Sequence, residues 1–214
     1  MQSREQIRAA YDAVAGEYAA RFADELADKP LDRELLDRFV RVTVPGGTIY
    51  DLGCGPGQTT AFLASCGANV RGLDLSPALL VEARRRHPSL EFVEGDMLAL
   101  PVEDGHAAGI VAFYSLVHFS DAERHGAFRE MARALHGGGI LLVAFHIGDD
   151  AVRIDEFLGQ PVVLEFTFLQ PARVVAELER AGFRDVDVVE RDHYPDVEYP
   201  SRRAYVFARK RSSD

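Results

Sequence analysis

The amino-acid sequence predicts an α/β fold, in which a mostly parallel sheet carries helices on both faces. Segments typical of short strands alternate with segments typical of helices through the middle of the chain. The strand-like segments are almost continuously apolar, which is typical of parallel strands covered on both faces. A glycine-rich turn follows the first strand, where open sheets of this kind bind ligands. We expect a single domain over residues 1–214, because a chain of this length can form one substantial core.

Strands and helices can be assigned in order from residue 48 onward. We expect strands at residues 48–52, 69–73, 90–93, 109–113 and 140–145. We expect helices between them at residues 57–65, 77–86 and 121–135. Ser76 would cap the second helix, Asp121 would cap the third, and the glycine run 137–139 would end the third. Segment 140–145 is the most apolar, so we expect it to lie inside the sheet.

The two ends of the chain depart from this alternation. Residues 1–45 are mostly helical in character and are expected to form an N-terminal helical lid. After the fifth strand, residues 146–169 fit no strand–helix unit, so we expect an insertion or lid over the carboxyl edge of the sheet. A helix at 170–181 is followed by two strand-like segments, 186–191 and 204–208, with no helix between them. Those two segments are expected to pair antiparallel at the end of the sheet.

Composition narrows the possible partners and the compartment. The chain has 24 Lys and Arg against 34 Asp and Glu, a formal net charge of −10, which argues against a nucleic-acid partner. No apolar stretch approaches the ~18 residues of a membrane span, and the N-terminus has no secretory signal. Two cysteines without a CxxC pair argue against a disulfide scaffold or a metal site. We expect a cytoplasmic monomer or homodimer with no membrane partner.

The strongest motif is Asp51-Leu52-Gly53-Cys54-Gly55-Pro56-Gly57, which ends the first strand and opens the first helix of the sheet. Glycines at such a turn let the backbone bend sharply and let a ligand approach it closely. A dinucleotide site would have the spacing G-x-G-x-x-G, whereas the third glycine here comes one residue early. Asp51 would repel a pyrophosphate beside this turn and suits a ligand that carries an ammonium group.

Two further acids follow the next two strands. Asp74 could accept hydrogen bonds from a ribose diol, and Asp96 could accept one from an exocyclic amine, with Met97 as apolar surface for a purine. Each acid could instead only cap its own turn. Asp51, Asp74 and Asp96 lie 23 and 22 residues apart, one strand–helix unit each. We expect the three carboxylates to converge around one nucleoside-bearing ligand.

With these motifs and Gly137-Gly138-Gly139, the chain resembles the class I S-adenosylmethionine-dependent methyltransferases. The resemblance implies a Rossmann-like seven-stranded sheet whose last strand is antiparallel, and S-adenosylmethionine as the cofactor. It also implies site roles. The methionine moiety would be lined by Asp51, Gly53 and Gly55 and closed over by Tyr114, the ribose would be held by Asp74, and the adenine would be flanked by Asp96 and Met97.

The N-terminal segment that holds Tyr11 and Tyr18 resembles the lid helix of the small-molecule members of this family. The two tyrosines are seven residues apart and share one helix face. They could cover a cofactor or reach its carboxylate, or they could be an aromatic stripe that only packs against the core.

Two histidines are candidates for a catalytic base. His118 follows the fourth strand and His146 follows the fifth, where the acceptor is expected. Their ordinary pKa of ~6.5 suits proton removal at neutral pH. Either histidine could instead have only a packing role, and a base is optional when the acceptor ionises easily. The acids of segment 148–169 could bind a cationic acceptor or could form the solvated face of a lid.

These observations favour methyl transfer to a small-molecule acceptor by in-line displacement. One alternative is an oxidoreductase that uses a nicotinamide dinucleotide, which shares the sheet and the ribose acid but not the glycine spacing. Another is a module that binds the cofactor without catalysing a reaction.

Overall fold

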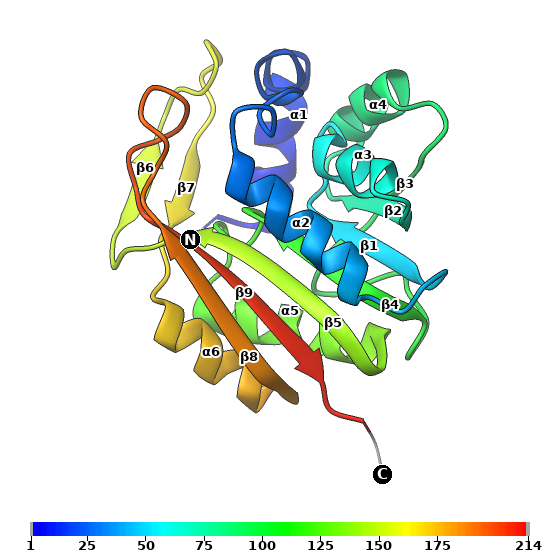
Figure 1. Cartoon of the computed structure of the whole chain (residues 1–214). Coiled ribbons are helices and arrows are strands. Elements are labelled where there is room, and N and C mark those ends of the chain that lie inside the picture. Colours follow the sequence, from blue (N-terminus) through cyan, green and yellow to red (C-terminus); the bar gives the residue numbers. More distant parts are fainter. Residues whose placement is uncertain (1, 213–214) are drawn as a thin grey trace.

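A computed structural model describes residues 2–212, and its centre is one seven-stranded sheet (Figure 1). The strand order is β3-β2-β1-β4-β5-β9-β8. The strands are β1 (Thr48–Leu52), β2 (Asn69–Asp74), β3 (Glu91–Glu94), β4 (Ala107–Phe113), β5 (Leu135–His146), β8 (Phe183–Arg191) and β9 (Arg203–Lys210). Strands β1 to β5 pair in parallel, and β9 runs antiparallel to both β5 and β8. The predicted Rossmann-like sheet with an antiparallel last strand is confirmed.

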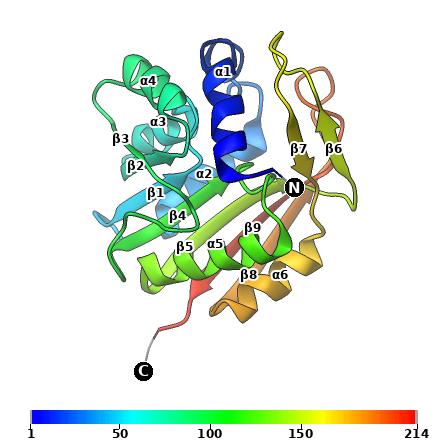
Figure 2. The same cartoon turned by 180° about the vertical axis from the view of Figure 1, so that it is seen from behind.

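Helices cover both faces of this sheet, as Figures 1 and 2 show. The helices are α1 (Arg4–Phe22), α2 (Pro30–Val42), α3 (Gln58–Ser65), α4 (Pro77–Arg86), α5 (Asp121–Ala134) and α6 (Pro171–Arg180). Leu36 and Phe39 of α2 pack with Leu63 of α3 in one apolar cluster, while Phe128 of α5 and Leu178 of α6 belong to the other. Two layers of helices therefore enclose the apolar strands β4 and β5.

The start of α5 differs from the prediction. Ser120, not Asp121, is the N-cap, and its hydroxyl accepts from the backbone N–H of Glu123. The Glu123 side chain accepts from the Ser120 backbone N–H in return, which completes a capping box. Asp121 is the first helical residue.

The end of α5 also differs from the prediction. The helix stops at Ala134, and β5 begins at Leu135 and runs through the glycine run 137–139. A Cβ at Gly139 would lie 3.0 Å from the carbonyl oxygen of His136. The glycines therefore allow a close backbone approach inside a strand, and they do not end the helix.

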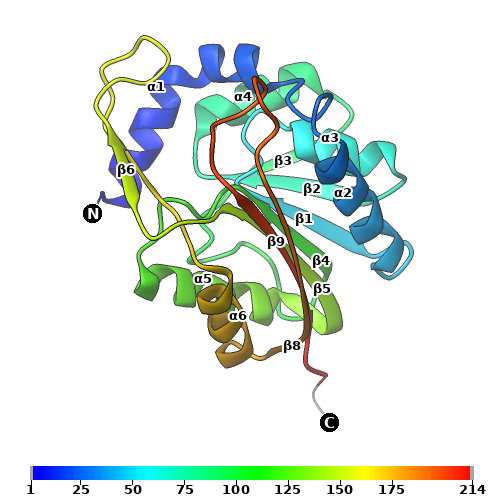
Figure 3. The same ribbon diagram turned by 60° about the vertical axis from the view of Figure 1, so that its left-hand side comes forward.

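Helix α1 and the segment after β5 lie at the carboxyl edge of the sheet, whereas α2 packs on one of its faces. Strands β6 (Ala151–Ile154) and β7 (Leu164–Thr167) form a separate antiparallel hairpin. Figures 2 and 3 show α1 beside this hairpin, and in Figure 2 helix α1 lies between the hairpin and α4. In residues 2–212, no helix is both long enough and apolar enough to cross a bilayer.

Candidate functional site

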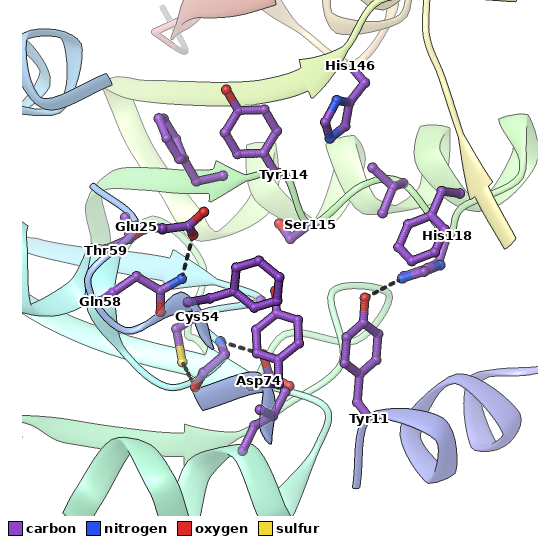
Figure 4. Close-up of a pocket in the computed structure, with 18 of the residues that line it drawn as sticks. Tyr11, Glu25, Cys54, Gln58, Thr59, Asp74, Tyr114, Ser115, His118 and His146 are labelled. Atoms are coloured by element: carbon purple, nitrogen blue, oxygen red, sulfur yellow. Dashed lines mark hydrogen bonds between the residues drawn. The ribbon is translucent and has the colours of Figure 1, made fainter. Parts of the chain in front are cut away.

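A cavity of about 920 Å³ opens at the carboxyl ends of β1, β2, β4 and β5. Its walls come from the glycine turn after β1, the turns after β2 and β4, α1, the β6–β7 hairpin and the loop between β8 and β9. Figure 4 shows labelled side chains from α1, the glycine turn and the ends of β2, β4 and β5 directed into one space. Its position agrees with the general location of ligand sites in open α/β sheets.

The glycine turn and the acid after β2 form one hydrogen-bonded unit. Gly53 and Gly55 adopt positive φ angles of 70° and 54°, which side chains with a Cβ rarely allow. The Gly55 N–H donates to Oδ2 of Asp74 at 2.8 Å, and the Ser76 N–H donates to Oδ1 at 2.8 Å. Burial raises the pKa of Asp74, while these backbone donors oppose that shift. Gly53, Gly55 and Asp74 all line the cavity.

Asp51 lies elsewhere. Its side chain is 1% exposed and accepts from the hydroxyl of Thr60 in α3 at 2.6 Å. Burial raises its pKa to about 7, and the nearby charge of Asp74 adds to the shift. Asp51 is absent from the described lining of the cavity. Its hydrogen bond with Thr60 connects β1 to α3.

Asp96 is directed toward the N-terminal helix. Its carboxylate accepts from Nη2 of Arg4 at 3.0 Å and from the backbone N–H of Leu98 at 2.9 Å. Met97, its neighbour, does line the cavity. The expected convergence of three carboxylates is therefore not observed. Asp74 belongs to the described lining of the cavity, whereas Asp51 and Asp96 do not.

Tyr11 and Tyr18 share one face of α1, as expected from their spacing. Their ring centroids are 5.7 Å apart, edge to face, and both rings line the cavity. A Cβ at Gly55 would lie 3.8 Å from Cε1 of Tyr18, so this ring lies directly over the glycine turn. Burial raises the pKa of both phenols, so each keeps its proton at neutral pH.

His118 forms a defined pair with Tyr11 (Figure 4). The Tyr11 hydroxyl lies 2.8 Å from Nε2 of His118, and the backbone carbonyl of Glu165 lies 2.7 Å from Nδ1. A carbonyl only accepts, so Nδ1 carries the proton and Nε2 accepts from Tyr11. Burial lowers the pKa of His118 to about 4, and nearby Arg4 contributes. The ring is therefore neutral and faces the cavity, so it does not serve only to pack beneath α5.

His146 and Tyr114 enter the cavity from the ends of β5 and β4. Nδ1 of His146 lies 2.7 Å from the Ser201 hydroxyl, and burial lowers the pKa of His146 to about 4, with Arg203 nearby. Tyr114 has a positive φ of 56°, and its hydroxyl lies 2.8 Å from that of Tyr205. The Tyr114 hydroxyl is thus tied into the protein interior, while its ring lines the cavity.

Three cavity residues had no motif to mark them in the sequence. Nε2 of Gln58 donates to Oε1 of Glu25 at 2.9 Å, and Nζ of Lys29 donates to Oε2 of Glu25 at 2.7 Å. Oε1 of Gln58 is buried with no hydrogen-bond partner among the described residues. A buried acceptor of this kind favours a ligand that can donate to it.

Comparisons with known proteins agree with this geometry. Residues 49–139 match the family model described as "Methyltransferase domain". A demethylmenaquinone methyltransferase from Beutenbergia cavernae is 37% identical over 100 residues, which is 47% of this chain and 41% of that relative. The match therefore spans less than half of the relative's length.

Solved structures share the fold over nearly the whole chain. The DhpI complex with S-adenosylhomocysteine has a TM-score of 0.76 at 22% identity and covers 98% of each chain. The [4+2]-cyclase SpnF has a TM-score of 0.71 at 20% identity, over 99% of this chain and 98% of that one. At these identities the likeness concerns the fold alone.

Residues 49–139, which carry the glycine turn and the acids at the ends of β1, β2 and β3, therefore match a methyltransferase domain, and the seven-stranded sheet that contains them has the fold of solved S-adenosylmethionine-dependent methyltransferases. This confirms the resemblance seen in the sequence motifs. S-adenosylmethionine is the cofactor of those methyltransferases, in agreement with the cofactor expected from the motifs.

Proposed function

We propose that this protein transfers a methyl group from S-adenosylmethionine to a small-molecule acceptor by in-line displacement. The observation that carries the proposal is the position of Asp74 beside the glycine turn, on the wall of a cavity that also holds the Tyr11–His118 pair. When bound, the cofactor supplies a methyl group on a positively charged sulfur, which keeps the bonding electron pair when the methyl group leaves.

The residues present fit the nucleoside half of that cofactor. Each oxygen of Asp74 accepts one backbone N–H, and a carboxylate has about four acceptor positions. Asp74 can therefore also accept from both hydroxyls of a ribose. Met97 lines the same cavity and offers an apolar surface to the adenine, whereas Asp96 is bonded to Arg4 and is absent from the described cavity lining.

The amino-acid half of the cofactor fits a second group of residues. The unpaired Oε1 of Gln58 and the carboxylate of Glu25 are acceptors for an ammonium group. Gly53 and Gly55 leave room beside them for the ligand chain, and Tyr18 covers the turn. Asp51 would act on this half indirectly, by holding α3 in position through Thr60.

The Tyr11–His118 pair can serve as the base. Because Nδ1–H of His118 donates to Glu165, Nε2 is held without a proton. A proton that leaves the acceptor would pass to the Tyr11 oxygen as the Tyr11 proton moves to Nε2 of His118. His146 is the second candidate, since it is neutral at pH 7 and lines the same cavity.

The test is a metabolite-library assay with purified protein and methyl-labelled S-adenosylmethionine. We expect label to move to one class of small molecule, and we expect this transfer to fall strongly in Asp74→Ala. A protein that binds the cofactor but labels no compound would contradict the proposal and favour a module without methyl-transfer activity. The [4+2]-cyclase SpnF favours that second candidate, because it has the same fold and its name describes a reaction other than methyl transfer.

A further inference from the structure

The β6–β7 hairpin is amphipathic, and its apolar face lines the cavity. Val152 pairs with Phe166 and Ile154 pairs with Leu164, and successive residues of a strand alternate between faces. Val152, Ile154 and Phe166 line the cavity, while Arg153 between them is exposed. The hairpin therefore presents an apolar wall inward and a charged surface outward.

Aromatic residues next to the hairpin strands extend the apolar face of the hairpin along the cavity. We use the name aromatic chamber for the part of the cavity lined by Val152, Ile154, Phe157, Phe166 and Phe168. The ring centroids of Phe157 and Phe166 are 6.3 Å apart, and the Phe168 ring stacks on His146 at 5.3 Å with an angle of 21° between the planes. Flat apolar compounds pack well against walls of this composition, through burial and through offset or edge-to-face contacts.

The buried cations nearest the chamber are paired with acids of the protein. Arg203 lies 3.0 Å from Oε2 of Glu198, and its guanidinium also donates to the backbone carbonyl of Tyr199. Arg191 donates to Glu198 from the other side, and Lys29 is bonded to Glu25. Arg21, Glu156 and Asp196, which also line the cavity, are exposed to solvent. The buried cations beside the chamber are therefore paired with acids, and Arg21, which has no ion-pair partner among the described residues, is solvated.

The hairpin also positions the candidate base. The Glu165 carbonyl that fixes the His118 proton belongs to β7, and the His118 ring lies 5.0 Å from the Phe166 ring. The Tyr11–His118 pair is thus at the border of the chamber. A compound held against Phe166 would have its polar group next to a proton acceptor. A hydroxyl group can give up a proton there and keep an electron pair for the methyl group, whereas an ammonium group has no electron pair to accept a methyl group while it stays protonated.

We propose that the aromatic chamber is the acceptor site and that it selects an uncharged, planar ring compound carrying a hydroxyl group. The ring would pack against Phe166 and Phe168, and the hydroxyl would face Tyr11. This inference rests on the proposed function and narrows its acceptor to one chemical class.

The first test measures binding and does not depend on turnover. Purified protein with saturating S-adenosylhomocysteine is titrated at pH 7 with 2-naphthol, 2-naphthoate and 2-(aminomethyl)naphthalene, three probes that share a ring system and differ in charge. We expect 2-naphthol to bind at least about tenfold more tightly than either charged probe. Equal or tighter binding of a charged probe, or no binding of 2-naphthol, would overturn the inference.

The second test maps the site. Phe166→Ala and Phe168→Ala should each weaken 2-naphthol binding by about tenfold, while S-adenosylhomocysteine affinity changes by less than about twofold. Phe166→Leu, which keeps most of the apolar volume, should have an intermediate effect. Arg153→Ala, on the outward face of the same hairpin, is the matched control and should change neither affinity. Unchanged 2-naphthol binding in both alanine variants would show that the ring binds elsewhere.

The two proposals fail in different ways. If the wild-type protein does not bind S-adenosylhomocysteine, the result counts against the proposed function. Normal S-adenosylhomocysteine binding with the wrong order of probe affinities would count against the aromatic chamber alone.

Discussion

The backbone amide of Gly55 lies 2.8 Å from Oδ2 of Asp74, so the glycine turn after β1 and the acid after β2 are joined directly. Two motifs 19 residues apart therefore act as one structural unit. A change in the carboxylate would affect both the ribose contacts and the shape of the turn.

Asp74→Ala should weaken S-adenosylmethionine binding by about 1–3 kcal/mol, because charge-assisted hydrogen bonds to the ribose and to Gly55 disappear. Calorimetric titration measures this directly. Asp104→Ala is a suitable control, since its side chain is 81% exposed and is absent from the described cavity lining. Wild-type affinity in Asp74→Ala would mean that Asp74 is only a turn residue.

Tyr11→Phe and His118→Gln should each lower kcat by about a hundredfold if the pair relays a proton. The double variant should be little worse than either single variant, because both changes interrupt the same relay. Steady-state kinetics of the four proteins tests this. Fully multiplicative losses would indicate two independent roles.

The pH dependence of kcat/KM should reflect the lowered pKa of His118. With that pKa at about 4, the ring is already neutral at pH 6, so activity should be level between about pH 6 and 8 and should fall only toward pH 4. An ordinary histidine would give a midpoint near ~6.5 instead. A midpoint near that value, absent in His118→Gln, would contradict the buried neutral state described for this ring.

Asp51→Asn should stabilise the protein at neutral pH. The folded-state pKa of Asp51 is about 7, above its unfolded value of 3.8, so the folded state binds more protons between these values. The free energy of unfolding of the wild type therefore falls as pH rises from 4 to 7, and the variant avoids about 1–3 kcal/mol of this loss. Denaturant melts at pH 4.5 and 7.5 test this. A stability difference between the two proteins that does not change with pH would contradict the raised pKa.

Asp32→Ala should destabilise the protein by about 3 kcal/mol. Asp32 is fully buried and accepts from Nη2 of Arg191 at 2.7 Å, so its removal leaves a buried cation with one partner fewer. Asp37→Ala on the same helix removes an exposed ion pair with Arg41 and should cost less than about 1 kcal/mol. Chemical denaturation separates the two. Equal effects would mean that the buried network adds no stability.

The sheet could be predicted from sequence because its signals are local. β1 begins and ends at the expected residues, and α4 begins at Pro77 after the Ser76 cap as expected. The β6–β7 hairpin was not assigned, although its signals were present: apolar and polar residues alternate in 152–154, and Leu158-Gly159 forms a tight turn with two positive φ angles. Strands β6 and β7 are short and have no helix between them, so the strand–helix alternation that predicted the main sheet did not indicate them.

Site residues could be predicted from sequence only where the strand order alone fixes their position. Asp74 lines the cavity because the ends of parallel strands meet at one edge. The Asp51 side chain turns instead to Thr60, and Asp96 is bonded by Arg4 from a helix 92 residues away. The Tyr11–His118 contact joins residues 107 apart, and nothing local in the sequence indicates such pairs.

The most direct test of the central claim is calorimetric titration of the purified protein with S-adenosylhomocysteine and, separately, with NADH. The account predicts saturable S-adenosylhomocysteine binding that weakens by about 5- to 150-fold in Asp74→Ala, together with no NADH binding. Tight binding of NADH with no response to S-adenosylhomocysteine would contradict it.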